Sequence, residues 1–362
     1  MQITRKILRT VGVLLLLLLL VIACLRLASI FREDGVPDEI APKSGRFIQV
    51  SDARIFVQEQ GPKAGQSVLL VHGTGAWSGL WQETATALSD QGYRTLAVDL
   101  PPFGFSELRG SNDYSRTAQA RRLAELVDAL GGSRPILVGH SYGGGPAAEF
   151  ALREPQKLRK LVLVDAALGI GEAAGKPLQL PLRSQLLREA LVSMTAANPL
   201  MTRRILSTFI HRKDRALPKY VAILSLPLGK RSYTESVASW LPNLLAVDTD
   251  ALSAQARPWR HLDLPVEMLW GDKDTVTPLT QAQYLASLLS NGNLTILPDI
   301  GHIPQVEAPD IFQRELLKAV SDWSLHSPQL TDVGKLKPIS VPRPLTANGT
   351  IAESGHPLIG SR

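Results

Sequence analysis

The chain has 362 residues, 44% of them hydrophobic and 20% charged, which fits a globular protein with a sizeable core and excludes a disordered, collagenous or small disulfide-stapled chain. Five basic and no acidic residues in positions 1–32 account for most of the net charge of +6, so the near-neutral remainder gives no reason to expect nucleic-acid binding. The single cysteine, Cys24, excludes an intrachain disulfide, a thiolate metal site and a redox pair.

An apolar run at residues 11–31 follows three basic residues and is long enough to span a bilayer. Its one charge, Arg26, lies near the C-terminal end, where a long side chain can reach the lipid headgroups. The basic flank favours a cytoplasmic N-terminus, so residues 1–32 are predicted to be a single-pass anchor with an extracytoplasmic domain behind it. Two alternatives stay open: a secreted protein with a cleaved signal, and a lipoprotein, because the sequence VIAC resembles a lipobox ending at Cys24.

Beyond a polar linker at residues 33–45, short runs of Val, Ile and Leu alternate with helical patterns bounded by Gly and Pro. The predicted strands cover residues 47–50, 54–59, 68–71, 94–98, 136–139, 161–164, 266–270 and 294–297. The predicted helices cover residues 80–90, 117–130, 144–153, 280–289 and 311–325. The first two strands read as a hairpin and the later six as parallel strands, so we predict an α/β fold with a mostly parallel eight-stranded sheet and flanking helices.

About 100 residues separate the strand at 161–164 from the strand at 266–270, and a connection of that length has structure of its own. We therefore predict that residues 170–260 form an inserted helical lid, and that residues 46–169 and 261–325 form the core. The predicted lid carries 13 basic and six acidic residues, whereas the core is acidic. Residues 326–362 hold five prolines and few large apolar residues, which is typical of a disordered tail.

The pattern G-x-S-x-G stands between a predicted strand and a predicted helix, at residues 139–143. A serine at such a sharp turn has a strained backbone, and the flanking glycines leave the room that the turn requires. The turn also brings the hydroxyl to a helix N-terminus, which favours a developing alkoxide. We predict that Ser141 is a nucleophile.

A serine nucleophile needs a general base and an acid that orients this base, and the order Ser, acid, His is the test. Two later loops leave the C-terminal ends of predicted parallel strands, where open α/β sheets build their sites. His302, in the second of these loops, is the predicted base. Asp274, in the first, is the predicted acid; Asp272 is expected to brace the same turn, and Asp165, after another strand end, is the alternative.

An oxyanion hole needs two backbone donors aimed at one point. The amide of Tyr142, the residue after the nucleophile, supplies one by the geometry of the turn. The other is expected from the loop after the third strand, where we choose Thr74 and keep Gly73 as the next candidate. His72 in the same loop is interpreted as a residue that braces the loop.

Five motifs in this order carry a resemblance to a known family: HGTG, DLPPFGFS, GHSYGG, GDKDTVTP and GHIPQVEAP. On these motifs, residues 46–325 resemble the α/β-hydrolase superfamily, in its serine-nucleophile branch with a helical cap between the sixth and seventh strands. The resemblance implies the same triad and the same two oxyanion donors. One departure is Pro102, which stands where the pattern D-x-x-G-x-G-x-S has its first glycine. The serine at position 141 separates the chain from the family's epoxide hydrolases and haloalkane dehalogenases, which use Asp.

The sequence thus predicts a membrane-tethered serine hydrolase that cleaves small-molecule or lipid-like carboxylic esters without a cofactor or metal. Because the lid and the pocket select the substrate, a carbon–carbon bond hydrolase, a thioesterase, an amidase and a cofactor-free peroxidase stay open on the same triad. A non-catalytic, tethered binding module is the alternative from another class. The basic lid suggests contact with anionic headgroups or with a lipid-like substrate; alternatively its arginines pair with the acidic core.

Overall fold

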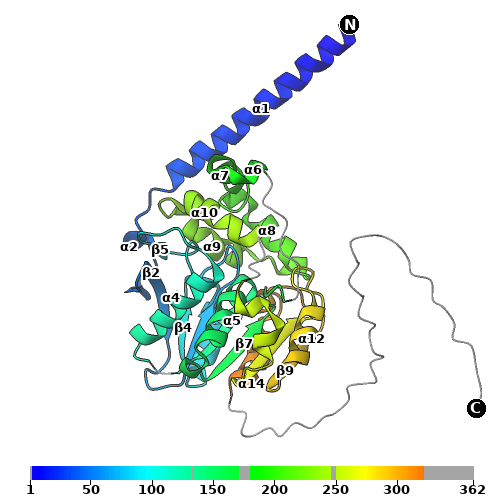
Figure 1. Ribbon diagram of the computed structural model, residues 1–362. Helices are drawn as coiled ribbons and strands as arrows, with labels where there is room; N and C mark the ends of the chain where they lie inside the picture. Colours follow the sequence, from blue (N-terminus) through cyan, green and yellow to red (C-terminus); the bar gives the residue numbers. More distant parts are fainter. Residues whose placement is uncertain (1, 133, 171–179, 246–249, 322–362) are drawn as a thin grey trace, which may run out of the picture. The chain divides into compact units, whose positions relative to one another are not determined.

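The computed structural model describes residues 2–132, 134–170, 180–245 and 250–321. The tail expected at residues 326–362 lies outside these ranges. Figure 1 shows a central sheet with helices against it, a layer of further helices above the sheet, and the long helix α1 leaving on that upper side.

The sheet has the strand order β1-β2-β4-β3-β6-β7-β8-β9, with the short β5 paired to β2. Its strands are β1 (Gly45–Gln49), β2 (Ala53–Gln60), β3 (Ser67–Val71), β4 (Arg94–Val98), β5 (Glu107–Leu108), β6 (Ile136–His140), β7 (Lys160–Val164), β8 (Val266–Gly271) and β9 (Gly292–Leu297). β1 and β2 form an antiparallel hairpin, β2 is antiparallel to β4, and the pairs from β4 to β9 are parallel. The predicted mostly parallel sheet is confirmed, and β5 is a ninth strand that the sequence did not indicate.

Helices cover both faces of the sheet because the central strands are apolar on both sides. In β3, Leu69 and Val71 belong to one core cluster, whereas Val68 and Leu70 belong to the other. The first cluster includes side chains of α4 (Arg116–Ala129), α5 (Gly144–Arg153) and α12 (Leu279–Leu288). The second includes side chains of α3 (Gln82–Asp90) and α14 (Pro309–Val320). The five predicted core helices correspond to these five, within a few residues at each end; the last four positions predicted for the final helix, 322–325, lie outside the described residues.

In the part that the structure describes, the elements between β7 and β8 are helices joined by loops, in agreement with an inserted helical lid; its bounds at 170–260 stay a prediction. We call it the cap. Its elements are α6 (Leu180–Arg183), α7 (Gln185–Met194), η4 (Pro199–Met201), α8 (Thr202–Phe209), η5 (Lys213–Arg215), α9 (Pro218–Ser225), η6 (Leu226–Gly229), α10 (Tyr233–Leu245), η7 (Leu252–Ala254) and α11 (Ala256–Trp259). Trp240 and Tyr233 of α10 pack with Phe103 and Tyr114 of the core, so an aromatic cluster joins the cap to the sheet domain.

The N-terminal helix α1 (Gln2–Arg32) contains a stretch, Arg9–Arg32, that is long and apolar enough to cross a membrane, a test that a signal sequence also meets. Its C-terminal end packs against α7. The guanidinium of Arg26 bonds to Glu189 of α7 at 2.7 Å, and its expected place at the lipid headgroups stays a prediction. The segment expected as a linker contains the short helix α2 (Pro37–Ile40).

Candidate active site

The turn after β6 holds Ser141 in a backbone conformation that few residues adopt. Its φ is +50°, in the left-handed region, as expected for a serine on a sharp strand-to-helix turn. A Cβ at Gly143 would lie 2.3 Å from the backbone oxygen of His72, and one at Gly139 would lie 2.7 Å from the Cβ of Ala147. The two glycines of the motif are therefore required by close packing, and the turn at η2 (Ser141–Gly143) cannot accept larger residues there.

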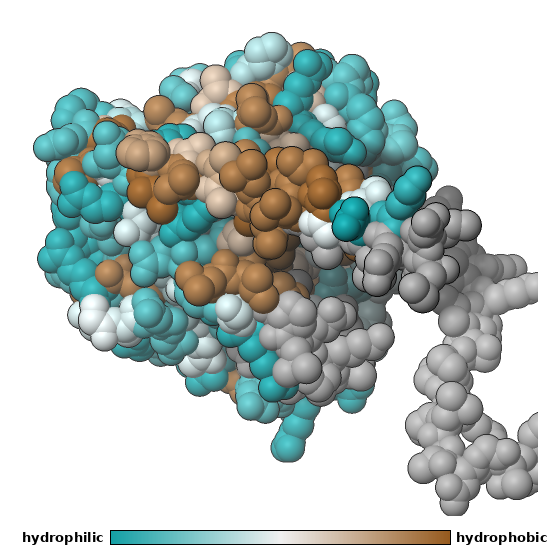
Figure 2. All heavy atoms as spheres, turned by 90° about the horizontal axis from the view of Figure 1, so that it is seen from above, coloured by the Kyte–Doolittle hydropathy of each residue, from teal (hydrophilic) through white to brown (hydrophobic). Residues whose placement is uncertain are grey.

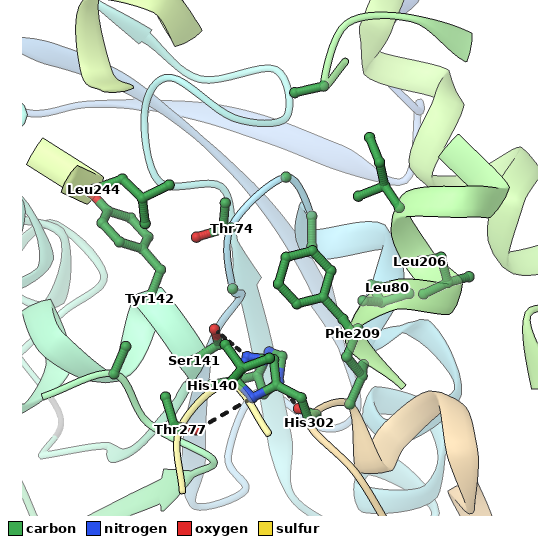
Figure 3. Close-up of a pocket in the computed structure, with 18 of the residues that line it drawn as sticks. Thr74, Leu80, His140, Ser141, Tyr142, Leu206, Phe209, Leu244, Thr277 and His302 are labelled. Carbon is green, nitrogen blue, oxygen red and sulfur yellow. Dashed lines mark hydrogen bonds between the residues drawn. The ribbon is translucent and has the colours of Figure 1, made fainter. Parts of the chain in front are cut away.

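Three of the predicted site residues form a continuous hydrogen-bonded chain, of which Figure 3 shows Ser141 and His302. The Oγ of Ser141 lies 2.7 Å from Nε2 of His302, and Nδ1 of His302 lies 2.8 Å from Oδ2 of Asp274. All three side chains are buried. They come from loops after β6, β8 and β9, whose carboxyl ends meet at one edge of the sheet.

The loop after β8 fixes the Asp274 carboxylate from several directions. Its Oδ1 accepts hydrogen bonds from the amides of Val276 at 2.7 Å and Thr277 at 3.0 Å. Its Oδ2 accepts from the Thr277 hydroxyl at 2.6 Å as well as from His302. Burial alone would raise the pKa of Asp274, but the hydrogen bonds from His302 and Thr277 lower it below its ordinary value. The carboxylate is thus ionised and can orient the imidazole.

The alternative acid, Asp165, lies after β7 and is fully buried. Its Oδ1 accepts from the amide of Gly271 at 2.9 Å, and its Oδ2 has no hydrogen-bond partner among the described residues. Burial, with the nearby charge of Asp274, raises the pKa of Asp165 well above its ordinary value. The carboxyl group that bonds to Nδ1 of His302 is that of Asp274, which makes Asp274 the better candidate for the acid.

Two buried groups that the sequence analysis passed over hold the His302 loop in place. The Glu307 carboxylate accepts from the amides of Gly301 at 3.1 Å and Ile303 at 3.3 Å, on either side of His302. The ring of His140, the residue before Ser141, lies 2.8 Å from the carbonyl oxygen of His302 through its Nε2. Burial lowers the pKa of His140 to about 3, so it is a neutral donor in this bond. Both residues lie within the motifs that carry the family resemblance, Glu307 in GHIPQVEAP and His140 in GHSYGG. Their place in these motifs was the sequence feature that could have indicated a role.

The same Glu307 carboxylate also reaches the cap, where its Oε2 accepts from the amides of His211 at 2.9 Å and Arg212 at 3.0 Å. Its backbone carbonyl accepts from Nε of Arg215 at 2.9 Å. One buried side chain therefore joins the loop that carries His302 to the cap.

The loop after β3 passes directly against Ser141. A Cβ at Gly73 would lie 2.9 Å from the Cβ of Ser141, which leaves room for glycine alone. His72 braces the loop: its Nδ1 donates to the Gly73 carbonyl at 2.8 Å, and its Nε2 accepts from the amide of Leu100 at 2.9 Å. Thr74 and Tyr142 both line the pocket beside Ser141 (Figure 3). That their amides hold an oxyanion stays a prediction.

The loop with Pro102 is held by bonds from the cap, and it keeps a glycine in the left-handed region at Gly104, whose φ is +57°. The ammonium of Lys230, buried in the cap, donates to the carbonyl oxygens of Pro102 at 2.9 Å and Ser106 at 2.8 Å. Asp99 of the same loop accepts from the amides of Ser78 and Phe105. Burial lowers the pKa of Lys230 to about 8 and raises that of Asp99 to about 6. None of these groups lies on the hydrogen-bonded chain of Ser141.

A cavity of about 910 Å³ lies above Ser141, between the sheet and the cap. The cap side of the cavity is predominantly apolar, and its lining includes Ile205, Leu206, Phe209, Leu224, Leu228 and Leu244. Ser141 and His302 lie at its floor (Figure 3). Within the described ranges, no three His, Cys, Asp or Glu side chains gather where they could hold a metal ion.

The family follows from a comparison with protein-family models, in which residues 66–309 match the model of the alpha/beta hydrolase fold. The chain is an α/β hydrolase. The resemblance drawn from the sequence motifs is thereby confirmed, and the family match includes the loops that carry Ser141, Asp274 and His302.

Known proteins similar to this α/β hydrolase have different activities. A 2-hydroxymuconate semialdehyde hydrolase of Pseudomonas putida is 28% identical over 290 residues, which cover 79% of this chain and 98% of that protein. Lipase 1 of Psychrobacter immobilis is 29% identical over 268 residues, covering 72% of this chain and 78% of the lipase. The crystal structure of a membrane phospholipase A superposes with a TM-score of 0.61 at 25% identity, covering 85% of this chain and 93% of that chain.

Proposed function

We propose that this α/β hydrolase is a serine hydrolase that cleaves carboxylic esters through an acyl-enzyme on Ser141. The observation that carries the proposal is the buried hydrogen-bonded chain from Ser141 through His302 to Asp274. An ionised Asp274 accepts from Nδ1 of His302, so Nδ1 carries a proton and Nε2 presents its lone pair to the serine hydroxyl. This tautomer is the one that a general base requires.

The reaction follows from this arrangement. Nε2 of His302 takes the hydroxyl proton while Oγ of Ser141 attacks the ester carbonyl carbon, and the resulting oxyanion is held by the amides of Thr74 and Tyr142. The imidazolium then gives the proton to the leaving alkoxide, and the acyl group stays on Ser141. In the second half, His302 takes a proton from water, whose oxygen attacks the acyl carbon, and the acid product leaves as Oγ regains its proton.

The shape and lining of the cavity support an ester with a substantial apolar acyl or alkyl group. A cavity of about 910 Å³ walled by leucine and phenylalanine side chains gains free energy from each methylene it buries, about 0.8 kcal/mol per group. The lipase among the relatives fits this substrate class. A lipid-like ester is therefore the proposed substrate.

A second candidate is carbon–carbon bond hydrolysis, because a relative aligned over 98% of its own length is a 2-hydroxymuconate semialdehyde hydrolase. Such a substrate is small and polar. The apolar cap wall gives it few partners, and Arg116, a cation among the described lining residues, already donates to the carbonyls of Ala167 and Leu168. The ester substrate is the better fit.

The test is active-site labelling of the full chain in detergent with a fluorophosphonate probe. The parent and Ser287→Ala, a control at an exposed serine, are expected to label, whereas Ser141→Ala and His302→Ala are expected not to label. Rates on nitrophenyl esters of two to twelve carbons should then rise with chain length. A folded parent that does not label would refute the serine hydrolase and favour a binding module. Labelling together with faster cleavage of 2-hydroxymuconate semialdehyde than of any ester would favour the second candidate.

We further propose that α1 is an uncleaved membrane anchor with the hydrolase domain on the extracytoplasmic side. Residues 22–33 pack on the cap and would be lost in part if a signal were removed (Figure 1). Mass spectrometry of the mature protein from the membrane fraction should find Met1 or Gln2 at its start. A shorter N-terminus would favour secretion, and a diacylated Cys24 would favour the lipoprotein.

A further inference from the structure

The last turns of α1 pack against the cap and are joined to it by side-chain hydrogen bonds and an ion pair. Arg26 pairs with Glu189 of α7 at 2.7 Å, and the hydroxyls of Ser29 and Ser193 lie 3.4 Å apart in a buried contact. At the end of the helix, the Glu33 carboxylate accepts from the amide and the hydroxyl of Thr234. The orientation of the cap relative to α1 is therefore fixed by several bonds along two turns.

This packing extends into the apolar run of α1. The partly or fully covered side chains of its last turns are Ile22, Leu25, Arg26, Ser29 and Arg32, which lie on one face at spacings of three and four. Ile22 is nine residues before the end of the run at Phe31, a distance of about 13 Å along a helix. A bilayer core needs about 20 apolar residues, and the run has 21, so α1 can span a membrane only if nearly the whole run lies inside it. Because the last part of the run packs beside α7, the surface of that membrane lies at the level of α7.

The outward side of α7 has the composition of a membrane-contacting helix. Leu186, Leu187 and Leu191 are 76%, 51% and 40% exposed, while Glu189 and Ser193 face α1. Leu200, in η4 directly after α7, is 86% exposed. An ordinary surface helix buries its leucines and exposes its polar side chains, whereas α7 exposes leucines and covers Glu189 and Ser193. Figure 2 is viewed from the side of the molecule that α1 leaves, and the apolar residues that gather there include α1 itself, which projects toward the viewer.

The same stretch of chain borders the cavity above Ser141. Thr195 and Ala196, immediately after α7, line it, and so do Ile205 and Leu206 of α8. Arg203 and Arg204, on the same helix α8, are exposed, and the predicted cap as a whole is basic. Exposed leucines next to exposed arginines match the two layers of an anionic bilayer surface, acyl chains and headgroups.

We propose that α7 and η4 are immersed in the surface of the bilayer that α1 spans, and that the lipid-like ester enters the cavity from this bilayer past Thr195 and Ala196. The route for the substrate rests on the proposed ester hydrolase; the docking of α7 does not. The partner surface is an anionic phospholipid bilayer, contacted by the four exposed leucines, which we call the α7 leucines: Leu186, Leu187, Leu191 and Leu200.

Docking can be measured without any catalysis. The full chain, with Cys24→Ser, is reconstituted into vesicles of phosphatidylcholine and phosphatidylglycerol and carries a nitroxide at Leu187→Cys or, as control, at Ile296→Cys. Ile296 is similarly exposed, at 45%, but lies on β9 of the core. The label at position 187 is expected to be accessible to oxygen and shielded from an aqueous nickel chelate, and the label at 296 the reverse. Equal access of the nickel chelate to both labels would overturn the docking.

The substrate route is tested by Leu186→Ser/Leu187→Ser/Leu191→Ser, with Ile296→Ser as the matched control. Hydrolysis of a bilayer-embedded long-chain ester should fall about tenfold or more in the triple variant, while hydrolysis of a soluble short-chain nitrophenyl ester stays within about twofold. An unchanged rate on the bilayer ester would overturn the route. An equal fall on both esters would overturn it too, because the leucines would then serve cap packing. A parent without esterase activity would refute the proposed function, and the nitroxide measurement would still decide the docking.

Discussion

Replacement of Asp274 by Asn should abolish activity by reversing one hydrogen bond. Oδ1 of Asp274 accepts from two backbone amides, those of Val276 and Thr277, so an asparagine must keep its carbonyl oxygen there. Its NH₂ group then takes the place of Oδ2, which lies 2.8 Å from Nδ1 of His302. Because an NH₂ group donates, Nδ1 must accept and the ring proton moves to Nε2.

In that tautomer Nε2 of His302 can only donate to the Ser141 hydroxyl and can no longer take its proton. We expect kcat/KM to fall about 10⁴-fold, which corresponds to about 5.5 kcal/mol in the activation barrier. The fold should be retained, since the asparagine fills the same volume and keeps the two backbone bonds.

Asp165→Asn is the matched control, because it makes the same chemical change in a neighbouring buried carboxyl group. Asp165 is not the carboxyl group that bonds to Nδ1 of His302, and an asparagine carbonyl can accept from the Gly271 amide as its Oδ1 does now. The kcat/KM of this variant should stay within about threefold of the parent.

The assay is hydrolysis of a nitrophenyl ester with the rate of fluorophosphonate labelling measured in parallel, after circular dichroism has shown both variants to be folded. If Asp274→Asn kept more than about a tenth of the parental kcat/KM, the tautomer argument would be wrong. If Asp165→Asn lost as much activity as Asp274→Asn, Asp165 would have to be readmitted as the acid.

Three further predictions concern the elbow, the cavity and the core. Gly143→Ala would place a Cβ 2.3 Å from the His72 carbonyl, so labelling by a fluorophosphonate should be lost even if the protein is recovered folded. Leu206→Trp should lower kcat/KM on a twelve-carbon ester at least about tenfold and leave an acetyl ester nearly unchanged, since it fills the cap side of the cavity. Asp52→Ala leaves the fully buried Arg122 without its bidentate partner and should cost about 3–5 kcal/mol in guanidinium denaturation at pH 7. The bond to Arg122 lowers the pKa of Asp52 to about 2, so its stabilisation is complete above about pH 4 and is lost as pH falls through about 2. If parent and variant differed in free energy of unfolding by the same amount at pH 7 and pH 2, this reasoning would be wrong.

Most of the sheet was predictable because parallel strands buried on both faces leave unbroken apolar runs, as in β3 and β6. β5 was missed because two residues give no periodicity. Ser141, Asp274 and His302 were found because each follows a strand end in a motif of fixed order. Their catalytic roles stay predictions until the variants above are measured.

The residues that were missed act through contacts that no local pattern encodes. Glu307 lies in a helix of four residues and bonds to amides nearly one hundred positions away, in the cap. Arg26 was expected to reach the headgroups because it lies near the end of an apolar run, and its bond to Glu189, 163 residues away, was not foreseen. In both cases the chemistry of the residue was readable and its partner was not, because the partner is set by how the cap folds back on the core.

The bonds of Glu307 also bear on how the cap can change over evolution. Its contacts with residues 211 and 212 are made to backbone amides, which every residue except proline offers. These two contacts therefore require a path of the chain and not particular side chains, whereas the bond to the Glu307 carbonyl requires the side chain of Arg215. Substitutions throughout the cap can remodel the cavity for a new ester while the loop of the histidine base keeps its position, so substrate range and catalytic geometry are free to vary separately.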